Sequence, residues 1–187
     1  SGARSDNYFY TMFSMPSTVD ISQFEDCINP ATGAMRWWQK DSGLNPYWAK
    51  DYNTNQDSRN RFLLNGSLTY KFTDWLRGEI KAGSDMYNTE TETKLYAGSP
   101  LSTNGRYSYG IQKFYENNYS FMFTAQKDQV IDKIGGTVTF GGNLMQRKST
   151  GLKNSLGTLI APDWFWMSNG DKGDLSVEQT LNEKKIN

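Results

Sequence analysis

The sequence predicts an all-β protein made of about five long antiparallel strands. Three observations support this prediction: side chains alternate between apolar and polar, proline is absent from the alternating runs, and long and short connections follow one another in turn. Aromatic residues make up 14% of the 187 residues, which is too many for a disordered protein. The predicted strands cover residues 7–15, 61–72, 75–87, 115–126 and 134–145.

The clearest run covers residues 61–72. Phe62, Leu64 and Leu68 fall on one side of such a strand and Asn65 on the other, because successive side chains of a strand point to opposite faces. A tight turn at residues 73–75 leads into the second run, which carries three charged residues in succession on one face. A charged face of this kind is unusual against a packed core and suits a wetted channel.

The remaining runs follow the same period of two. Residues 127–133 form a short polar connection between the runs at 115–126 and 134–145. The weakest run is residues 7–15, in which Tyr8, Tyr10 and Met12 share a face. Between and after the strands we expect three long loops, at residues 16–58, 88–114 and 146–187, the last ending in either a short helix or irregular chain.

This pattern of connections favours a membrane-spanning barrel segment. Outer-membrane barrels have short periplasmic turns and long extracellular loops, whereas loops beyond ~12–15 residues are uncommon in compact soluble domains. Runs of about 12 residues also exceed the usual ~5–6 of soluble sheets and are long enough for a tilted span of ~9–11 residues. Aromatic residues gather near the run ends, as in barrel girdles, so we expect outer-membrane lipid against one face.

Five strands are too few for a complete barrel. Single-chain outer-membrane barrels have at least ~8 strands, and an open edge facing lipid would leave backbone groups without hydrogen-bond partners. We therefore expect the chain to be an incomplete part of a larger barrel, and to lack the plug domain and the closing strands.

Composition argues against several other classes of protein. The 20 basic and 20 acidic residues cancel, whereas a nucleic-acid-binding module normally shows a basic face. Without histidine there is no Ser-His-Asp or Cys-His catalysis, and the single cysteine has no internal disulfide partner. The carboxylates of Glu79, Asp85, Glu116 and Asp132 would have to pair in a pocket to act as a glycosidase does. Lumen-facing charge is the better explanation, so we expect neither an enzyme nor a cofactor or metal.

A set of short motifs occurs in a fixed order between residues 7 and 143. They are Asn45-Pro46-Tyr47-Trp48, Asp57-Ser58-Arg59-Asn60-Arg61-Phe62, Leu68-Thr69-Tyr70, Thr73-Asp74-Trp75-Leu76, Gly83-Ser84-Asp85-Met86-Tyr87, Glu116-Asn117-Asn118 and Gly141-Gly142-Asn143. In order and spacing this set resembles the barrel of the SusC/RagA-like TonB-linked outer-membrane transporters.

The resemblance implies a parent barrel of about 22 strands closed by a plug. Such a parent imports nutrients too large for porins, namely oligosaccharides or peptides, across the bacterial outer membrane. A SusD-like surface lipoprotein would cover its extracellular loops. The TonB complex would supply energy, acting only through the plug region that this chain lacks.

Two sets of residues are candidates for function. We expect the first set to line the lumen, and its strand 75–87 members to pair with charges on neighbouring strands; the set is Arg77, Glu79, Lys81, Asp85 and Glu116. The second set consists of loop aromatics that would contact substrate or partner, namely Trp37, Trp38, Tyr47, Trp48, Trp164 and Trp166. Packing within the loops explains these rings equally well.

Two other functions stay open at this point. One is a soluble antiparallel β module that binds glycans through exposed aromatic rings, and the other is a small porin-like pore built from several copies. Dependence on lipid separates the soluble module from the two membrane hypotheses. The number of copies separates the pore from the transporter.

Overall fold

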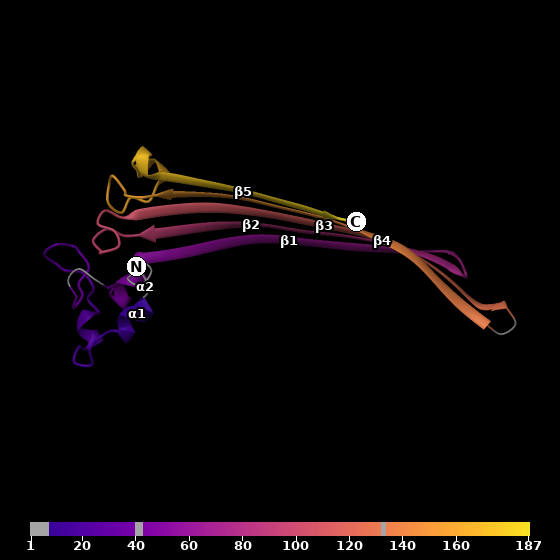
Figure 1. Cartoon of the computed structure of the whole chain (residues 1–187), viewed down its shortest axis with the longest axis horizontal. Helices are drawn as coiled ribbons and strands as arrows, with labels where there is room; N and C mark the ends of the chain where they lie inside the picture. The colour runs from indigo at the N-terminus through magenta and orange to yellow at the C-terminus, as the bar shows by residue number, and fades with distance from the viewer. Residues whose placement is uncertain (1–7, 40–42, 132–133) are drawn as a thin grey trace. The chain divides into compact units, whose positions relative to one another are not determined.

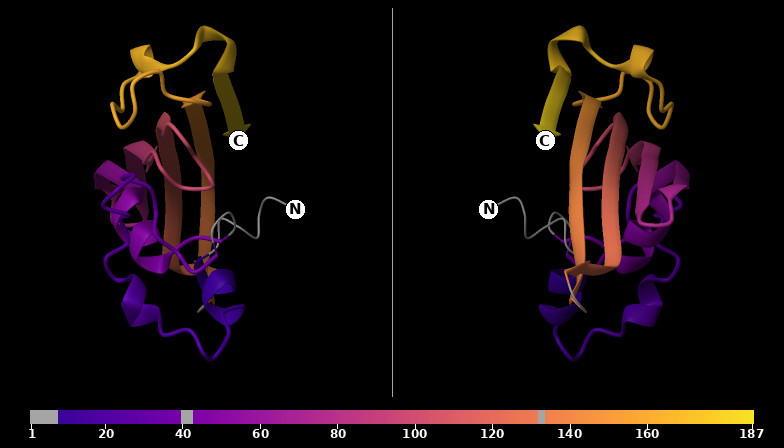
Figure 2. Two further views of the ribbon diagram at one scale, coloured as in Figure 1. Left: turned by 90° about the vertical axis from the view of Figure 1, so that its left-hand side faces the viewer. Right: turned by 90° about the vertical axis from the view of Figure 1, so that its right-hand side faces the viewer.

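The five strands of the protein form one antiparallel sheet in chain order, β1-β2-β3-β4-β5 (Figures 1 and 2). The structure is a computed structural model that describes residues 8–39, 43–131 and 134–187. The strands are β1 (Asn53–Thr73), β2 (Leu76–Leu95), β3 (Arg106–Ile131), β4 (Ile134–Leu156) and β5 (Leu175–Ile186). The predicted fold class, an all-β sheet of about five long antiparallel strands, is confirmed.

The helices of the described residues are short, and they either precede β1 or lie between β4 and β5. They are α1 (Tyr8–Phe13), η2 (Ile21–Phe24), α2 (Pro46–Tyr52), η3 (Met167–Asn169) and η4 (Lys172–Asp174), of which the three labelled η are 3-10 helices. In α2 the side chain of Asn45 accepts a hydrogen bond from Tyr47 N, and Pro46 occupies the first turn, where its missing N–H costs nothing. No helix in the described ranges is long and apolar enough to cross a membrane.

The strand predicted at residues 7–15 is wrong. Its central residues form helix α1 instead. Apolar side chains fall on both faces of this short run, at Tyr8, Phe9, Tyr10, Met12 and Phe13. Periodicity cannot separate a helix from a strand in so short an apolar segment.

The prediction of a helix or irregular chain after residue 175 is also wrong, because β5 occupies residues 175–186. Leu175, Val177 and Leu181 alternate with polar residues, but the Glu and Lys residues around them weaken the strand signal. Pairing with β4 decides the conformation, since a strand beside an open edge gains a ladder of backbone hydrogen bonds.

The loops are shorter than predicted because four strands run further than the alternation shows. The strand β1 starts at Asn53, β2 continues to Leu95, β3 starts at Arg106, and β4 continues to Leu156. In residues 146–156 the large apolar side chains are Leu152 and Leu156, near the end of the run, so the period of two is too weak to detect. Between strands, the connections that remain among the described residues are 74–75, 96–105 and 157–174.

The chain divides into two compact units, which we describe separately. The loop unit comprises residues 1–58, 90–110 and 152–178, and the strand unit comprises residues 59–89, 111–151 and 179–187. In the strand unit, the turn between β1 and β2 is closed by a hydrogen bond from Leu76 N to Thr73 Oγ1 at 3.1 Å. Backbone hydrogen bonds of the sheet and side chains of its two faces hold this unit together.

The loop unit has two small hydrophobic clusters. The first is built on Cys27, Leu44 and Trp48, and the second on Tyr107, Leu156 and Leu159. At the first cluster the fully buried Asn45 donates from Nδ2 to the main-chain oxygens of Phe24, at 2.9 Å, and of Arg36, at 2.8 Å. These bonds tie three separate stretches of the long N-terminal connection together, since a buried amide must satisfy its donors.

Candidate functional site

The two faces of the strand unit have different chemistry. On one face, which we call the apolar face, large apolar side chains stand exposed on four neighbouring strands, because one layer of strands has nothing packed over it. Its members are Phe62, Leu64, Leu68, Tyr70, Phe72, Ile80, Tyr115, Tyr119, Phe121, Phe123, Val138 and Phe140.

Aromatic rings of the apolar face contact one another across strands. The ring of Phe72 on β1 lies 6.1 Å from that of Phe123 on β3, with Gly78 of β2 between them. Phe121 on β3 lies 6.0 Å from Phe140 on β4. These contacts form a continuous aromatic band that faces the surroundings and not a protein core.

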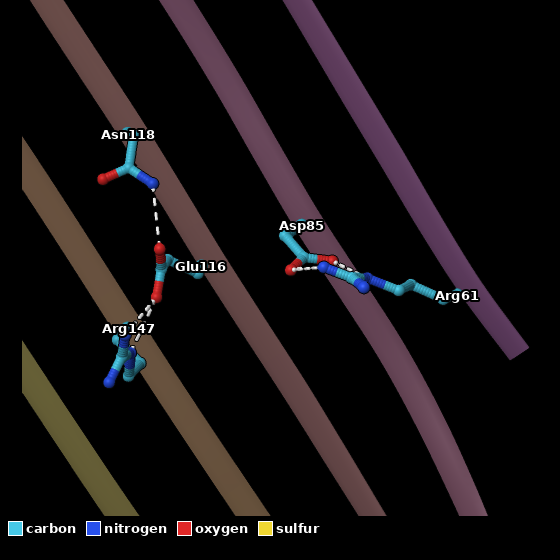
Figure 3. A network of polar contacts seen from close by, with 5 residues as sticks. All are labelled: Arg61, Asp85, Glu116, Asn118 and Arg147. Atoms are coloured by element: carbon cyan, nitrogen blue, oxygen red, sulfur yellow. Dashed lines mark hydrogen bonds and ion pairs between the residues drawn. The ribbon is translucent and has the colours of Figure 1, made fainter. Parts of the chain in front are cut away.

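The opposite face, which we call the polar face, carries ion pairs between adjacent strands. Arg61 on β1 donates to both carboxylate oxygens of Asp85 on β2, from Nε at 2.8 Å and from Nη2 at 2.7 Å. Arg147 on β4 donates from Nε to Glu116 Oε2 on β3 at 2.7 Å, and Asn118 Nδ2 donates to the other oxygen at 3.0 Å. Figure 3 shows both groups, with the carboxylates of Asp85 and Glu116 lying between the guanidinium groups of Arg61 and Arg147.

A second row on the polar face consists of rings and guanidinium groups. The rings of Tyr87 and Phe114 stack at 4.6 Å and 13°. The guanidinium of Arg59 lies 4.9 Å from the Tyr87 ring, and that of Arg147 lies 5.6 Å from the Phe114 ring. This row, Arg59–Tyr87–Phe114–Arg147, spans four strands, and we call it the aromatic–arginine stack. Cation–π and stacking contacts fix its side chains on the sheet.

Only some of the charged candidates form ion pairs between strands. Asp85 and Glu116 each pair with an arginine of an adjacent strand. Glu79 and Lys81 pair with each other along β2 at 3.1 Å, so the expected cross-strand pairing is wrong for both. Arg77 is exposed and has no ion pair within the described part of the chain, so the pairing expected for it is not observed. The fourth carboxylate considered for catalysis, Asp132, lies outside the described residues.

The aromatic candidates of the N-terminal connection pack inward. Trp48 is 2% exposed and stacks on Tyr52 at 4.4 Å, and Trp37 is 8% exposed and meets the ring of Phe24 edge-on. Tyr47 and Trp38 are half-buried. The expectation that Trp37 and Trp48 lie on the surface as contact residues is therefore wrong, because they form the interior of the loop unit.

The connection between β4 and β5 presents its tryptophans outward. Trp164 is 55% exposed and Trp166 is 65% exposed, whereas Phe165 between them turns inward to the rings of Tyr96 and Tyr107. The buried Asn169 holds this connection in shape through its amide group. These two tryptophans are the loop candidates that an external molecule reaches.

Alternation alone did not point to Arg59, Arg61, Phe114 or Arg147. The Arg61–Asp85 pair could have been found from the sequence. The tight turn after Thr73 fixes the register of β1 on β2, which brings Arg61 opposite Asp85. The Glu116–Arg147 pair could not be found in this way, because its prediction requires the exact position of the turn between β3 and β4. The sequence places that turn only within residues 127–133. No group of three or more acidic, histidine or cysteine side chains in the described ranges has the arrangement of a metal site.

A five-stranded antiparallel sheet with one exposed apolar face and one charged face is the architecture of part of a β-barrel wall. Two solved structures match it, described as the structure of the RagAB peptide transporter and as the RagAB peptide importer in the "closed-closed" state. Each is 17% identical to this chain, with a TM-score of 0.69, and each match covers 80% of this chain. The chain spans 17% of the length of those chains, so the likeness shows a shared fold over a small part of them. No protein-family model and no curated protein matches the sequence.

Proposed function

We propose that this chain is part of the barrel wall of a TonB-dependent transporter in the bacterial outer membrane. In this assignment the apolar face contacts lipid and the polar face lines the lumen. One observation carries it: exposed apolar rings and charged side chains lie on opposite faces of the same strands. Exposed apolar areas of this extent are uncommon on soluble monomers and mark an interface with lipid or protein.

The dimensions of the apolar face support lipid as its surroundings. On β1 its large side chains run from Phe62 to Phe72, which is the length of ~9–11 residues that a tilted strand needs to cross the hydrocarbon core. The soluble-module alternative loses support, because it leaves this face in water and because Trp37 and Trp48 are buried.

The cargo and partners are proposed from the resemblance and the structural likeness together. The cargo is an oligosaccharide or a peptide, and the likeness to a peptide transporter supports the peptide. A SusD-like surface lipoprotein would contact the connections of the loop unit, where Trp164 and Trp166 are exposed for such a contact. The TonB complex would act through a plug region outside this chain.

Two adjacent residues test the assignment of the faces. Ser67 and Leu68 are both exposed on β1 and point to opposite faces. In a full-length parent chain with Cys27→Ser, we would place a bimane label on Ser67→Cys or on Leu68→Cys and reconstitute each into lipid vesicles. Brominated lipid should quench the label at position 68 and aqueous iodide the label at position 67.

The outcome separates the functions. Equal quenching by iodide at both positions, with protein that stays soluble without detergent, would establish a soluble sheet and end the transporter assignment. A barrel that closes from several copies of a short chain, measured by mass, would favour the porin-like pore.

A further inference from the structure

The side chain of Arg59 contacts two neighbours on the polar face. Its Nε donates to Thr89 Oγ1 at 2.9 Å, and the Thr89 side chain is buried. Its Cζ atom lies 4.9 Å from the centre of the Tyr87 ring, which stacks on the ring of Phe114. A flexible arginine normally loses conformational freedom when it binds a ligand, and here the fold has already removed much of it.

Arg59 differs from the other two arginines of this region in its charge balance. Arg61 is paired with Asp85, and Arg147 is paired with Glu116. Among the described residues Arg59 has no carboxylate partner, and its two terminal nitrogens make no hydrogen bond there. The side chain is exposed, so these donors point to solvent or to a ligand.

We propose that Arg59 binds a carboxylate group of the solute that moves along the polar face. This inference rests on the proposed function, in which the polar face lines the solute's path. The planar guanidinium donates in a fork that matches the two oxygens of a carboxylate, and its single charge matches a monoanion. Thr89 and Tyr87 act as positioning residues, because they fix the fork without occupying its terminal donors.

Paired probes that differ only in the carboxylate test this proposal. We would measure binding to the full-length parent chain in detergent by calorimetry. The first pair is an acetylated hexapeptide with a free C-terminal carboxylate and the same peptide with a C-terminal amide. The second pair is trigalacturonic acid and its methyl ester. A charge-assisted hydrogen bond predicts at least about tenfold tighter binding of an acid than of its neutral partner.

The variants locate the effect. Arg59→Gln should abolish the preference for the acid, and Arg59→Lys should reduce it because lysine keeps the charge but lacks the fork. Arg36→Gln is the matched control: Arg36 is an exposed arginine outside the strand unit, and without it the preference should be unchanged. Preference within the peptide pair alone would identify a peptide C-terminus as the ligand group, and preference within the sugar pair alone a sugar acid.

Three results would overturn the proposal: equal affinity for acid and neutral probe, no binding of either acid, or an acid preference that survives Arg59→Gln. The face-labelling experiment on Ser67 and Leu68 separates this failure from failure of the proposed function. If lipid reaches position 68 and iodide reaches position 67 but no acid is preferred, only the role of Arg59 falls. If both positions meet water in a soluble protein, the transporter assignment falls first.

Discussion

Asn169 holds Trp164 in place: its amide nitrogen donates to the main-chain oxygen of Trp164 at 2.6 Å and to that of Ala161 at 2.7 Å. Its amide oxygen accepts from Ala161 N at 2.9 Å, and its own N–H donates to the main-chain oxygen of Trp166 at 2.9 Å. The side chain is 3% exposed. One buried amide therefore satisfies the backbone of the connection that exposes both tryptophans.

Replacing Asn169 by alanine should loosen this connection. The backbone groups of Ala161 and Trp164 would lose their partners, which should cost about 2 kcal/mol of local stability. Hydrogen exchange of amides in residues 157–171 should become faster, while exchange in β2 and β3 stays unchanged. Asn182→Ala, at an exposed position of β5, is the control and should have no such effect. Equal protection of these amides from exchange in Asn169→Ala and in the unsubstituted protein would show that other contacts hold the loop.

A larger residue should destabilise the sheet at Gly78 more than at Gly66. A Cβ atom at Gly78 would lie 2.9 Å from the ring of Phe72 and 3.0 Å from that of Phe123, whereas a Cβ at Gly66 would have nothing within 4 Å. Both glycines belong to the apolar face by alternation, so the pair isolates crowding from the loss of glycine itself. Gly78→Val should destabilise the protein by about 1–3 kcal/mol and Gly66→Val much less. Urea midpoints of the full-length chain in detergent measure the difference, and equal midpoints would contradict it.

Reversing one charge of the Arg61–Asp85 pair should have unequal effects. Asp85 and Glu116 lie on adjacent strands, so Arg61→Glu brings a third carboxylate beside two others. Asp85→Arg instead places a cation between Arg61 and Glu116. The new cation is repelled by Arg61 but attracted by the carboxylate of Glu116. We expect Arg61→Glu to lower the urea midpoint more than Asp85→Arg.

The double variant Arg61→Glu/Asp85→Arg should recover part of the loss, because it restores an opposite-charge pair in the same register. The difference between the two single variants should shrink in 1 M salt, since Arg61 is exposed and Asp85 is only partly buried. A double variant that is no more stable than Arg61→Glu alone would show that the pair contributes nothing to the sheet.

How far the sequence predicts the fold depends on the alternation of each segment. Residues 61–72 and 115–126 alternate cleanly, so the strands β1 and β3 are visible from sequence. Residues 146–156 are mostly polar, with Leu152 and Leu156 only near the end, and their strand conformation follows from pairing with neighbours that lie far away in the sequence. Tyr8–Phe13 is apolar on both sides, which fits a short helix as well as a strand.

The candidate site is predictable where local geometry fixes the register. Alternation places Asp85 and Glu116 among the charged residues of one face, but their partners Arg61 and Arg147 follow only from how strands align. Loop rings are harder to assign, because burial of Trp48 and exposure of Trp166 depend on packing within each connection. In the sequence, Trp48 and Trp166 are both aromatic residues in predicted loops, and nothing there distinguishes the buried one from the exposed one.

Cys27 should resist thiol reagents until the loop unit unfolds. The side chain is 6% exposed beside Leu44 and Trp48, and burial raises the pKa of its thiol because the thiolate would lose hydration. The thiolate is the reactive form, so labelling by a maleimide at pH 8 should be slow in the folded protein and fast in urea. The stability linked to this raised pKa is fully present below the ordinary thiol pKa, where the thiol is protonated in both states. It is lost as the pH rises through the pKa of the folded protein, because the thiol of the unfolded protein ionises first. Cys27→Ala removes that loss, so the two proteins should differ in the pH dependence of their urea midpoints above pH 9 and not below pH 8. Rapid labelling of Cys27 in the folded protein at pH 8 would contradict its burial in this cluster.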